Sequence, residues 1–547
     1  MYFVRGEWAC NFRLFYALAS FFLFLLSWLW PFHSPPWPSF WSEIFAVLAL
    51  SFLVMGLRRG YWGCETLFIF LVALVPVVQF FFGLVLRGSD AFLSSVYVLV
   101  FGLAFSVGAG CSGLRGELVK YFSFCVVLSA LLSAGIAIRQ WLGLVGGGDF
   151  ELGLVGLRSY ANLGQPNHLA TLLMMGLCGC LYLHLCGHLA RGVGAVAVFL
   201  LLFAVVLTQS RTPWLSGFAV VVFLVISRNE RASEFGFRGA LLSYLLYWLL
   251  VASLPFLSSL TDVSVVDPVA RASADARLNL WWQMFQILKE NWLFGVGWGQ
   301  IGISQVAISF SLPMGGWAEY SHNVALDLLL WNGVCFGGLV VLVCFIWLVR
   351  LGLREHDAEG VVAILMVGVI LTHGMLEFPL AYLYFLIPLG LSLGVAVAPY
   401  VSNCLVGSRI VLGGALILLG GVIFVGWEYL KVEQEELARR VSAAGVVGFE
   451  SVYEKDELFF LSGLSEVQSF KRMDPGQNFT FEERARLWGV VERYPQLSNI
   501  YRYAVIARSN GDSEGATKAL ALIKVFYGEA KYWSAMEELG YYYPRRK

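Results

Sequence analysis

The sequence predicts an all-α membrane protein that crosses the bilayer about thirteen times and ends in a small helical domain outside it. Composition is the first reason: 59% of the residues are hydrophobic and 14% are charged, whereas soluble proteins average roughly 45–50% and 25%. The second reason is that apolar residues form runs long enough to cross roughly 30 Å of hydrocarbon. The third is that the chain becomes charged and amphipathic from Glu428 onward. These features exclude a soluble globular protein.

The expected membrane-spanning helices follow one another along most of the chain. They lie near residues 12–30, 39–57, 65–86, 91–110, 119–142, 168–187, 192–208, 213–227, 239–259, 322–349, 360–376, 380–398 and 409–427. The first apolar run has no small-residue cleavage site, so we expect this span to be retained. Net charge is zero and no basic stripe interleaved with aromatic residues occurs, so no nucleic-acid partner is expected.

The basic residues of the connectors predict the orientation of the spans. Those on one side are Arg5, Arg13, Arg58, Arg59, Arg115, Lys120, Arg191, Arg228, Arg231, Arg238, Arg350, Arg354 and Arg409. This side is cytoplasmic by the positive-inside rule. An odd number of spans then puts the tail outside. The cysteines agree, because none falls in an exported loop or in the tail, where unpaired thiols would be oxidised.

Two outer connectors are long, roughly 143–167 and 259–321, and long loops are usually functional or disordered. The second contains a stretch of helical spacing, RLNLWWQMFQILKENWLFGVGWGQ. Its expected apolar side consists of Trp281, Trp282, Phe285, Leu288 and Trp292. This pattern predicts a helix that lies in the membrane interface.

The tail, residues 428–547, repeats short amphipathic segments such as FEERARLWGVVERYP and GATKALALIKVFYG. These segments predict a small all-helical domain, whose paired helices resemble tetratricopeptide packing. Two roles remain open for it: a surface that binds a partner protein, and a bundle that braces the outer loop.

Three arginines, Arg211, Arg271 and Arg277, stand on the outer side, where the charge rule disfavours them. An anionic partner would offset the cost of desolvating them, and a guanidinium group matches phosphate oxygens with two parallel hydrogen bonds. The alternative is that they reach lipid headgroups or pair with nearby aspartates. Those aspartates are Asp262, Asp267 and Asp275.

His322, in SHNVALDLLLWNG, stands where the second long outer loop enters a span. A neutral imidazole at this place can accept a proton from a hydroxyl nucleophile, and Asn323 or Glu319 could orient it. The alternative is a hydrogen-bonded cap of the helix. Asp327 lies deeper in the same span and is also a candidate, because carboxylates within membranes are rare and usually functional.

The segment GQPNHLAT ends the first long outer loop and gathers Gln165, Asn167 and His168 at the start of a span. Amide and imidazole groups at a helix N-terminus can hold sugar hydroxyls or phosphate. A Pro166 turn followed by an Asn167 cap is the alternative, and both interpretations can hold together.

A second outer turn, THGMLEFPLAYLYF, carries Glu377, Tyr382 and Tyr384. The tyrosines are of the kind that forms interfacial belts, whereas Glu377 has no such explanation. No ligand set for a metal is found, and GVGWGQ lacks the strand and the lysine of a nucleotide-binding loop. We therefore expect neither a metal nor another cofactor.

The order of these motifs resembles the O-antigen ligase and polymerase superfamily, and within it the bacterial protein O-oligosaccharyltransferases, the PglL-type ligases of pilin glycosylation. The motifs that carry the resemblance are, in order, GQPNHLAT, QSRTPWL, ARLNLWWQ with NWLFGVGWGQ, SHNVALDLLLWNG and HGMLEFPLAY. The resemblance covers Tyr160 to the C-terminus, and the first five spans carry no motif.

The resemblance implies a metal-independent, inverting transfer of glycan from undecaprenyl pyrophosphate to a Ser or Thr hydroxyl of a periplasmic protein such as pilin. It implies a bacterial inner-membrane location, with the active face and tail in the periplasm. The family's catalytic histidine matches His322, and its pyrophosphate-binding arginines match Arg211 and Arg277, with Arg271 near them. Further residues expected to bind or support the substrates are Gln165, Asn167, His168, Asn323, Glu377, Tyr382 and Tyr384.

Two rival functions remain. An O-antigen ligase or polymerase of the same superfamily would use a lipid A core sugar or another glycan as its acceptor. A transporter would show repeat-related halves and broken helices that meet at the midplane. The polar residues here gather at one face and no internal repeat is visible, which disfavours a transporter. The expected organisation is a catalytic membrane domain over residues 1–427 followed by the periplasmic tail.

Overall fold

The computed structural model is almost entirely helical, which confirms the predicted all-α class. It describes residues 2–144, 150–227, 236–260, 275–312, 316–354, 356–401, 405–444 and 458–540. Within these residues nine helices are long and apolar enough to cross a membrane, and four shorter apolar helices accompany them. The protein is therefore a multi-pass membrane protein.

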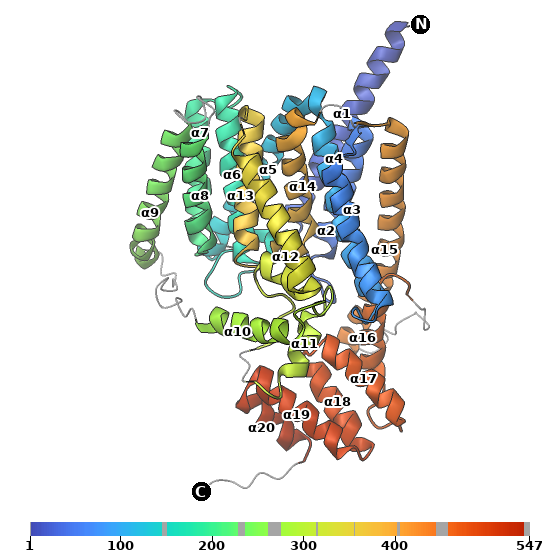
Figure 1. Cartoon of the computed structure of the whole chain (residues 1–547). Coiled ribbons are helices and arrows are strands. Elements are labelled where there is room, and N and C mark those ends of the chain that lie inside the picture. Colours follow the sequence, from blue (N-terminus) through green and yellow to red (C-terminus); the bar gives the residue numbers. More distant parts are fainter. Residues whose placement is uncertain are drawn as a thin grey trace. The chain divides into compact units, whose positions relative to one another are not determined.

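Each expected span coincides with a helix (Figure 1). These helices are α1 (Tyr2–Leu29), α2 (Phe40–Leu57), α3 (Cys64–Phe81), α4 (Gly88–Gly110), α5 (Arg115–Trp141), α6 (Pro166–Leu185), α7 (Arg191–Leu207), α8 (Thr212–Ile226), α9 (Phe237–Leu260), α12 (Val324–Gly352), α13 (Ala358–Gly374), α14 (Leu383–Val397) and α15 (Ser408–Ala443). The sequence places them well because span length and apolar character follow directly from bilayer thickness.

The remaining elements are short. The helices are α10 (Asp275–Glu290), α11 (Ile301–Ile308), α16 (Ser462–Arg472), α17 (Phe481–Arg493), α18 (Leu497–Ser509), α19 (Ser513–Tyr527) and α20 (Glu529–Glu538). Two short strands, β1 (Gly60–Tyr61) and β2 (Leu405–Val406), pair in antiparallel fashion.

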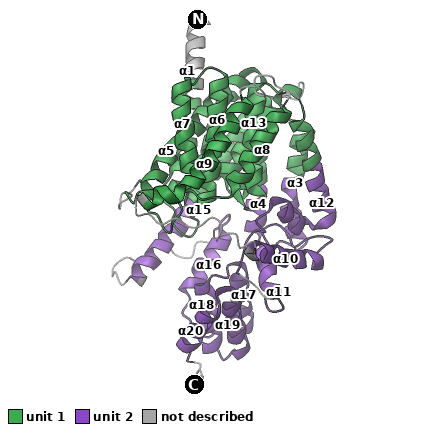
Figure 2. Cartoon of the chain, turned by 90° about the vertical axis from the view of Figure 1, so that its left-hand side faces the viewer, with its two compact units in different colours: residues 1–72, 96–272, 344–426 green, residues 73–95, 273–343, 427–547 purple. Residues whose placement is uncertain are grey.

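The chain divides into two compact units, which Figure 2 shows in different colours. Unit 1 comprises Met1–Val72, Val96–Ala272 and Cys344–Gly426. Unit 2 comprises Ala73–Ser95, Ser273–Val343 and Trp427–Lys547. The tail thus belongs to one unit with α10, α11 and the first part of α12, and α15 continues without interruption past Glu428.

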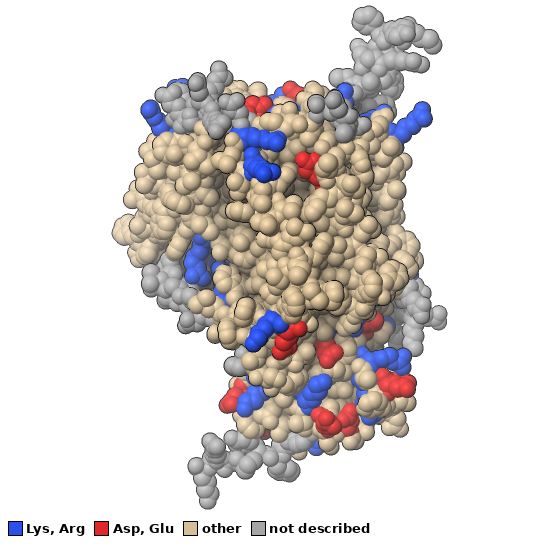
Figure 3. All heavy atoms as spheres, in the orientation of Figure 1, with Lys and Arg blue, Asp and Glu red and all other residues tan. Residues whose placement is uncertain are grey.

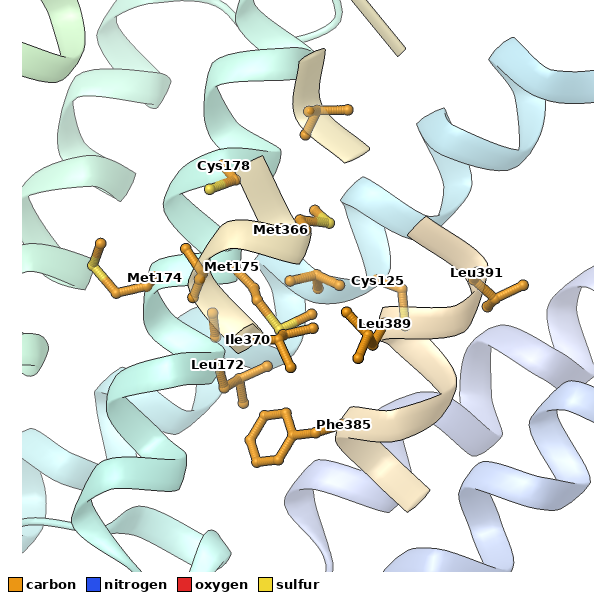
Figure 4. Packing of buried hydrophobic residues seen from close by; sticks show 14 of the residues in the cluster. Cys125, Leu172, Met174, Met175, Cys178, Met366, Ile370, Phe385, Leu389 and Leu391 are labelled. Carbon is orange, nitrogen blue, oxygen red and sulfur yellow. The ribbon is translucent and has the colours of Figure 1, made fainter. Parts of the chain in front are cut away.

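The core of unit 1 lies between α5, α6, α13 and α14 (Figure 4). Side chains such as Met175, Met366 and Phe385 fill it, and Cys125 and Cys178 are buried among them, as expected for thiols that serve packing. Small residues let the helices approach closely: a Cβ on Gly394 would lie 2.2 Å from the Phe105 carbonyl oxygen.

Large apolar side chains cover the outside of the spans. Figure 3 shows a broad uncharged band over these helices, with Lys and Arg gathered near its upper edge. Leu249 of α9 and Ile417 of α15 are among the exposed apolar residues. Exposed apolar area on this scale is not found on soluble monomers, so this surface is suited to contact with lipid.

In unit 2 the glycine-rich segment GVGWGQ packs against a break in α12. The helix is interrupted at Gly333 (φ 74°, ψ 171°). The amides of Val296 and Gly297 donate to the carbonyls of Leu330 and Trp331 beside this break, at 2.8 and 3.2 Å. Backbone groups that the break frees from the helix are therefore satisfied by the glycine-rich segment, as burial requires.

Clearance between these two backbones explains why the residues are glycines. A Cβ on Gly333 would lie 2.2 Å from the Leu293 carbonyl oxygen, and one on Gly295 would lie 2.4 Å from that of Leu330. Both glycines also have positive φ angles, which other residues rarely adopt. Packing therefore explains the glycines of GVGWGQ, and no bound phosphate is needed to account for them.

Candidate active site

His322 occupies a strained turn directly before α12. Its φ angle is +61°, in the left-handed region that few residues other than glycine adopt. The side chain is half-buried. Strained backbone conformations persist only where the surroundings impose them, and they gather at functional sites.

The neighbours of His322 show how the turn is imposed. The Ser321 amide donates to Asp327 Oδ1 at 2.7 Å, and the Ser321 hydroxyl donates to the Asn323 carbonyl at 3.0 Å. Asn323 Oδ1 accepts from the amides of Ala325 and Leu326 at 3.0 and 3.1 Å. Asn323 therefore caps the N-terminus of α12, and the buried Asp327 carboxylate fixes the residue that precedes the histidine.

Glu319, which the sequence offered as a partner for the imidazole, has another partner. Its carboxylate accepts a hydrogen bond from Arg493 Nη1 at 2.9 Å. The structure thus assigns Glu319 to an ion pair with the tail of the same unit.

The α10 helix carries Arg277 near the same turn. Trp281 Nε1 donates to the Ser321 carbonyl at 3.0 Å. Arg277 lies four residues before Trp281, so both side chains lie on one face of α10. This face is turned toward the segment that carries His322. Arg271 lies outside the described residues.

The exposed face of α10 differs from the one that the sequence predicted. Leu278, Trp282 and Phe285 are exposed, with more than half of each side chain accessible: 56%, 60% and 54%. Leu288 instead packs in a buried cluster with Met284 and Ile287. The expected apolar face is thus wrong for Leu288, and half-buried Trp281 is held by its hydrogen bond to Ser321. The remaining exposed aromatic residues still suit a membrane interface.

In unit 1 the residues of GQPNHLAT meet those of the outer turn after α13. Gln165, not Asn167, is the N-cap of α6: its side chain accepts from the His168 amide at 3.2 Å, and Pro166 follows in the first helical position. The Glu377 carboxylate accepts from Gln165 Nε2 at 3.0 Å and from Asn167 Nδ2 at 2.8 Å. The expected Asn167 cap is therefore wrong, because this amide binds a carboxylate from a distant segment.

His168 and the tyrosines form an adjacent aromatic group. His168 Nδ1 lies 3.0 Å from the Tyr384 hydroxyl oxygen, and both side chains are buried. The Tyr382 ring is half-buried and lies 4.7 Å from the His168 ring, measured between centroids. The two tyrosines thus differ in accessibility, and Tyr384 is the one that holds the histidine.

Arg211 directly precedes α8, on a turn that is hydrogen-bonded to the same cluster. Ser210 Oγ donates to Asn167 Oδ1 at 2.7 Å, and Gln209 before it has a φ of +47°. The Arg211 side chain is exposed, and among the described residues its guanidinium takes part in no hydrogen bond or ion pair. The Arg211 guanidinium therefore stands on a turn held by hydrogen bonds and is accessible to an anion.

Arg158 belongs to this cluster and was missed by the sequence argument. It donates from Nε to the Thr208 carbonyl at 2.9 Å and from Nη2 to Asn167 Oδ1 at 3.0 Å. It also lines a surface pocket of about 500 Å³ formed mainly by residues 152–166. The charge rule that singled out Arg211 applies equally to Arg158, which stands in the first of the two long connectors that the sequence predicts to be on the outer side.

The candidate residues therefore form two groups. The group in unit 1 comprises Gln165, Asn167, His168, Arg211, Glu377, Tyr382 and Tyr384. The group in unit 2 comprises Arg277, His322 and Asn323. Across the described parts of the chain, no three His, Cys, Asp or Glu side chains are arranged to hold a metal ion.

Glu377→Ala is expected to lower activity about 10-fold, because the buried Asn167 amide and the half-buried Gln165 amide lose their acceptor at a cost of about 1–3 kcal/mol. Glu151→Ala is the matched control, since Glu151 pairs with half-exposed Arg139 elsewhere in unit 1. Initial rates of the two purified variants provide the comparison. If the two variants have equal rates, Glu377 does not contribute to the active site.

Three family models match the chain in succession. The model described as a protein glycosylation ligase matches residues 160–184. The model described as an O-antigen ligase matches residues 196–346. The model of the C-terminal part of a membrane-bound polymerase, described as a virulence factor, matches residues 361–538. The matched segments include both groups of candidate residues.

Two curated relatives from Acinetobacter baylyi are similar over nearly the whole chain. A general O-oligosaccharyltransferase is 30% identical over 522 residues, which cover 92% of this chain and 90% of the relative. A ComP-specific O-oligosaccharyltransferase is 27% identical over 510 residues, which cover 89% of this chain and 90% of the relative.

Proposed function

The chain belongs to the O-oligosaccharyltransferase family, and from this premise we propose that it moves a preassembled glycan from undecaprenyl pyrophosphate to a Ser or Thr hydroxyl. As a member of this family it is a glycosyltransferase that uses a glycan donor and a protein acceptor. The proposed acceptor is a periplasmic protein such as pilin. The proposed location is the bacterial inner membrane, with the active face and residues 428–547 in the periplasm, because the basic connectors favour this orientation.

His322 is the proposed general base. As the acceptor hydroxyl attacks the anomeric carbon, His322 takes its proton, the new glycosidic bond forms, and the bond from that carbon to the pyrophosphate oxygen breaks. Attack opposite the leaving group inverts the anomeric configuration. The single observation that carries this role is the strained turn directly before α12. There the His322 backbone has a φ of +61° and its imidazole is half-buried.

Arg211 and Arg277 are the proposed ligands of the pyrophosphate, with Arg271 as a third. Pyrophosphate is already a good leaving group, so the enzyme has to stabilise its growing negative charge and need not protonate it strongly. This role suits the available Arg211 guanidinium on its rigid turn. It also suits Arg277, on the face of α10 that binds Ser321. No metal is needed for such a reaction.

The remaining residues of unit 1 are proposed to support the donor. Glu377 is held by two amides, so its carboxylate oxygens have fixed directions. Gln165, Asn167 and His168 lie on the first turn of α6, where hydrogen-bonding groups can hold sugar hydroxyls. Tyr384 fixes His168, and the more accessible Tyr382 is the better placed of the two tyrosines to contact substrate.

Co-expression tests the proposal. Cells supply a lipid-linked glycan pathway, a candidate pilin acceptor and either the wild-type chain or His322→Ala, and the acceptor is analysed by intact mass. Glycan on the pilin with the wild type alone supports protein glycosylation. If lipopolysaccharide gains the glycan while the pilin stays unmodified, the acceptor is a lipid A core sugar, and the protein acts as an O-antigen ligase instead.

A further inference from the structure

The C-terminal helices pack directly on the segment that leads to His322. Val306 of α11 belongs to the same apolar cluster as Trp488 and Phe470 of the tail, and Trp317 packs against this cluster. Trp317 fits because residue 302 is glycine: a Cβ there would lie 2.7 Å from the indole nitrogen. All these residues lie in unit 2, so the tail and the outer loop share one hydrophobic core.

Arg493, the last residue of α17, joins the tail to two other segments of unit 2. Its Nη1 donates to Glu319 Oε1 at 2.9 Å, and its Nε donates to Asp90 Oδ2 at 3.0 Å. Glu319 precedes His322 by three residues, and Asp90 lies in the first turn of α4. The side-chain Nε2 of Gln300, at the end of GVGWGQ, also donates to Asp90 Oδ2 at 3.4 Å. One guanidinium therefore fixes three parts of the chain.

Burial makes the contact between Arg493 and Asp90 selective for geometry, whereas the Glu319 side chain is 38% exposed. The Arg493 and Asp90 side chains are each only 10% exposed. Burial lowers the pKa of Arg493, but Glu319 and Asp90 more than offset this and hold it well above its ordinary value. Buried ion pairs generally add little net stability, because desolvation consumes the electrostatic gain. Their clearest physical effect is to reject other arrangements of the same segments.

Further bonds carry this constraint from the tail to the histidine. Gln305 of α11 accepts from the Ala318 amide at 2.8 Å and donates to the Gly316 carbonyl at 3.1 Å. Beyond Glu319, the Ser321 carbonyl is held by Trp281, as described above. The segment 316–321 is thus fixed at its start by Gln305, in its middle by Arg493 and at its end by Trp281.

We propose that Arg493 is a positioning residue for glycan transfer, which binds Glu319 and Asp90 and thereby holds the segment that carries His322. The tail would then be part of the catalytic machinery through this contact, whether or not it also binds the acceptor. The inference rests on the proposed role of His322.

A pair of matched variants tests this proposal in the purified full-length protein. Arg493→Gln removes the charge that joins the three segments. Arg484→Gln removes an arginine of the same helix whose ion-pair partner, Asp512 at 3.2 Å, lies within the tail. Hydrogen exchange of residues 316–323 reports how firmly the segment is held. Transfer kinetics with a lipid-linked glycan and an acceptor protein report kcat and the donor KM separately.

Arg493→Gln is expected to speed exchange in residues 316–323 and to lower kcat by about 10- to 100-fold, because small misplacements of a reacting group have effects of this size. The donor KM should change little, and Arg484→Gln should resemble wild type in both measurements. Glu319→Gln leaves the Arg493–Asp90 pair in place, so this variant should lose less stability than Arg493→Gln. It should also lower kcat, and the double variant should add little to Arg493→Gln.

Unchanged exchange in residues 316–323 of Arg493→Gln would overturn the proposal, and so would equal kcat values for the Arg493 and Arg484 variants. Failure of the base assignment is recognised separately, because a fully active His322→Asn variant would contradict it whatever the exchange data show. In that case faster exchange together with a low kcat in Arg493→Gln would show that Arg493 holds residues 316–323 in a working arrangement, but not that it positions His322 as the base.

Discussion

Replacing His322 by asparagine is expected to lower the rate of glycan transfer by about 10²–10⁴-fold, the range typical of a lost general base. Asparagine tolerates the left-handed backbone at φ +61° better than alanine does, so it removes the imidazole with the least added strain. The measurement is the initial rate of acceptor glycosylation by purified enzyme at saturating donor. Donor affinity should remain close to that of wild type, because the imidazole acts on the acceptor.

His188→Ala is a suitable control for this variant. His188 is exposed in the turn after α6 and belongs to neither group of candidate residues. It should keep wild-type activity, and both variants should unfold at wild-type temperature in detergent. A fully active His322→Asn enzyme would exclude His322 as the base.

Removing the guanidinium of Arg211 or Arg277 is expected to cost about 10²–10³-fold in kcat/KM for the lipid-linked donor, similar to the loss of one donor that stabilises a transition-state anion. Arg→Lys variants should recover only part of the activity, because lysine keeps the charge but loses the paired hydrogen bonds. Donor titration with each purified variant provides the measurement. Membrane insertion should be unaffected, since Arg211 is exposed and Arg277 lies in the first turn of α10.

Two other basic residues serve as controls for these arginines. Arg139 in unit 1 is half-exposed and paired with Glu151, and Lys289 is exposed on the same helix as Arg277. Alanine at either control position should change kcat/KM by no more than about 2-fold, because exposed ion pairs contribute little. Unchanged donor dependence in Arg211→Ala and Arg277→Ala would remove both residues from the pyrophosphate site.

Hydropathy was enough to predict the spans, because a helix must have a minimum apolar length to cross a bilayer. It could not predict that residues 73–95, 273–343 and the tail form one compact unit. That grouping depends on contacts between distant segments, such as the 2.8 Å hydrogen bond from Gln79 to the Trp331 carbonyl. Individual polar side chains in the middle of apolar segments leave no periodic signal in the sequence.

The sequence singled out residues that the structure brings together in two groups, but it did not predict their contacts. Gln165 and Asn167 were singled out together, yet which of them caps α6 depends on where Glu377 lies. Arg158 was overlooked although it stands in a connector that the sequence predicts to be on the outer side. The exposed face of α10 was misjudged for Leu288 because the pattern alone does not reveal that α10 packs against neighbours in unit 2.

The packing of GVGWGQ against the break in α12 affects how relatives of this protein should be interpreted. Gly295 and Gly333 are required by clearance between two backbones, a requirement that would persist if the enzyme lost its activity or changed its acceptor. A homologue that has these glycines but lacks His322 would keep the architecture without the proposed general base. The glycine-rich motif is thus a marker of fold, and by itself it does not identify the reaction that a related sequence catalyses.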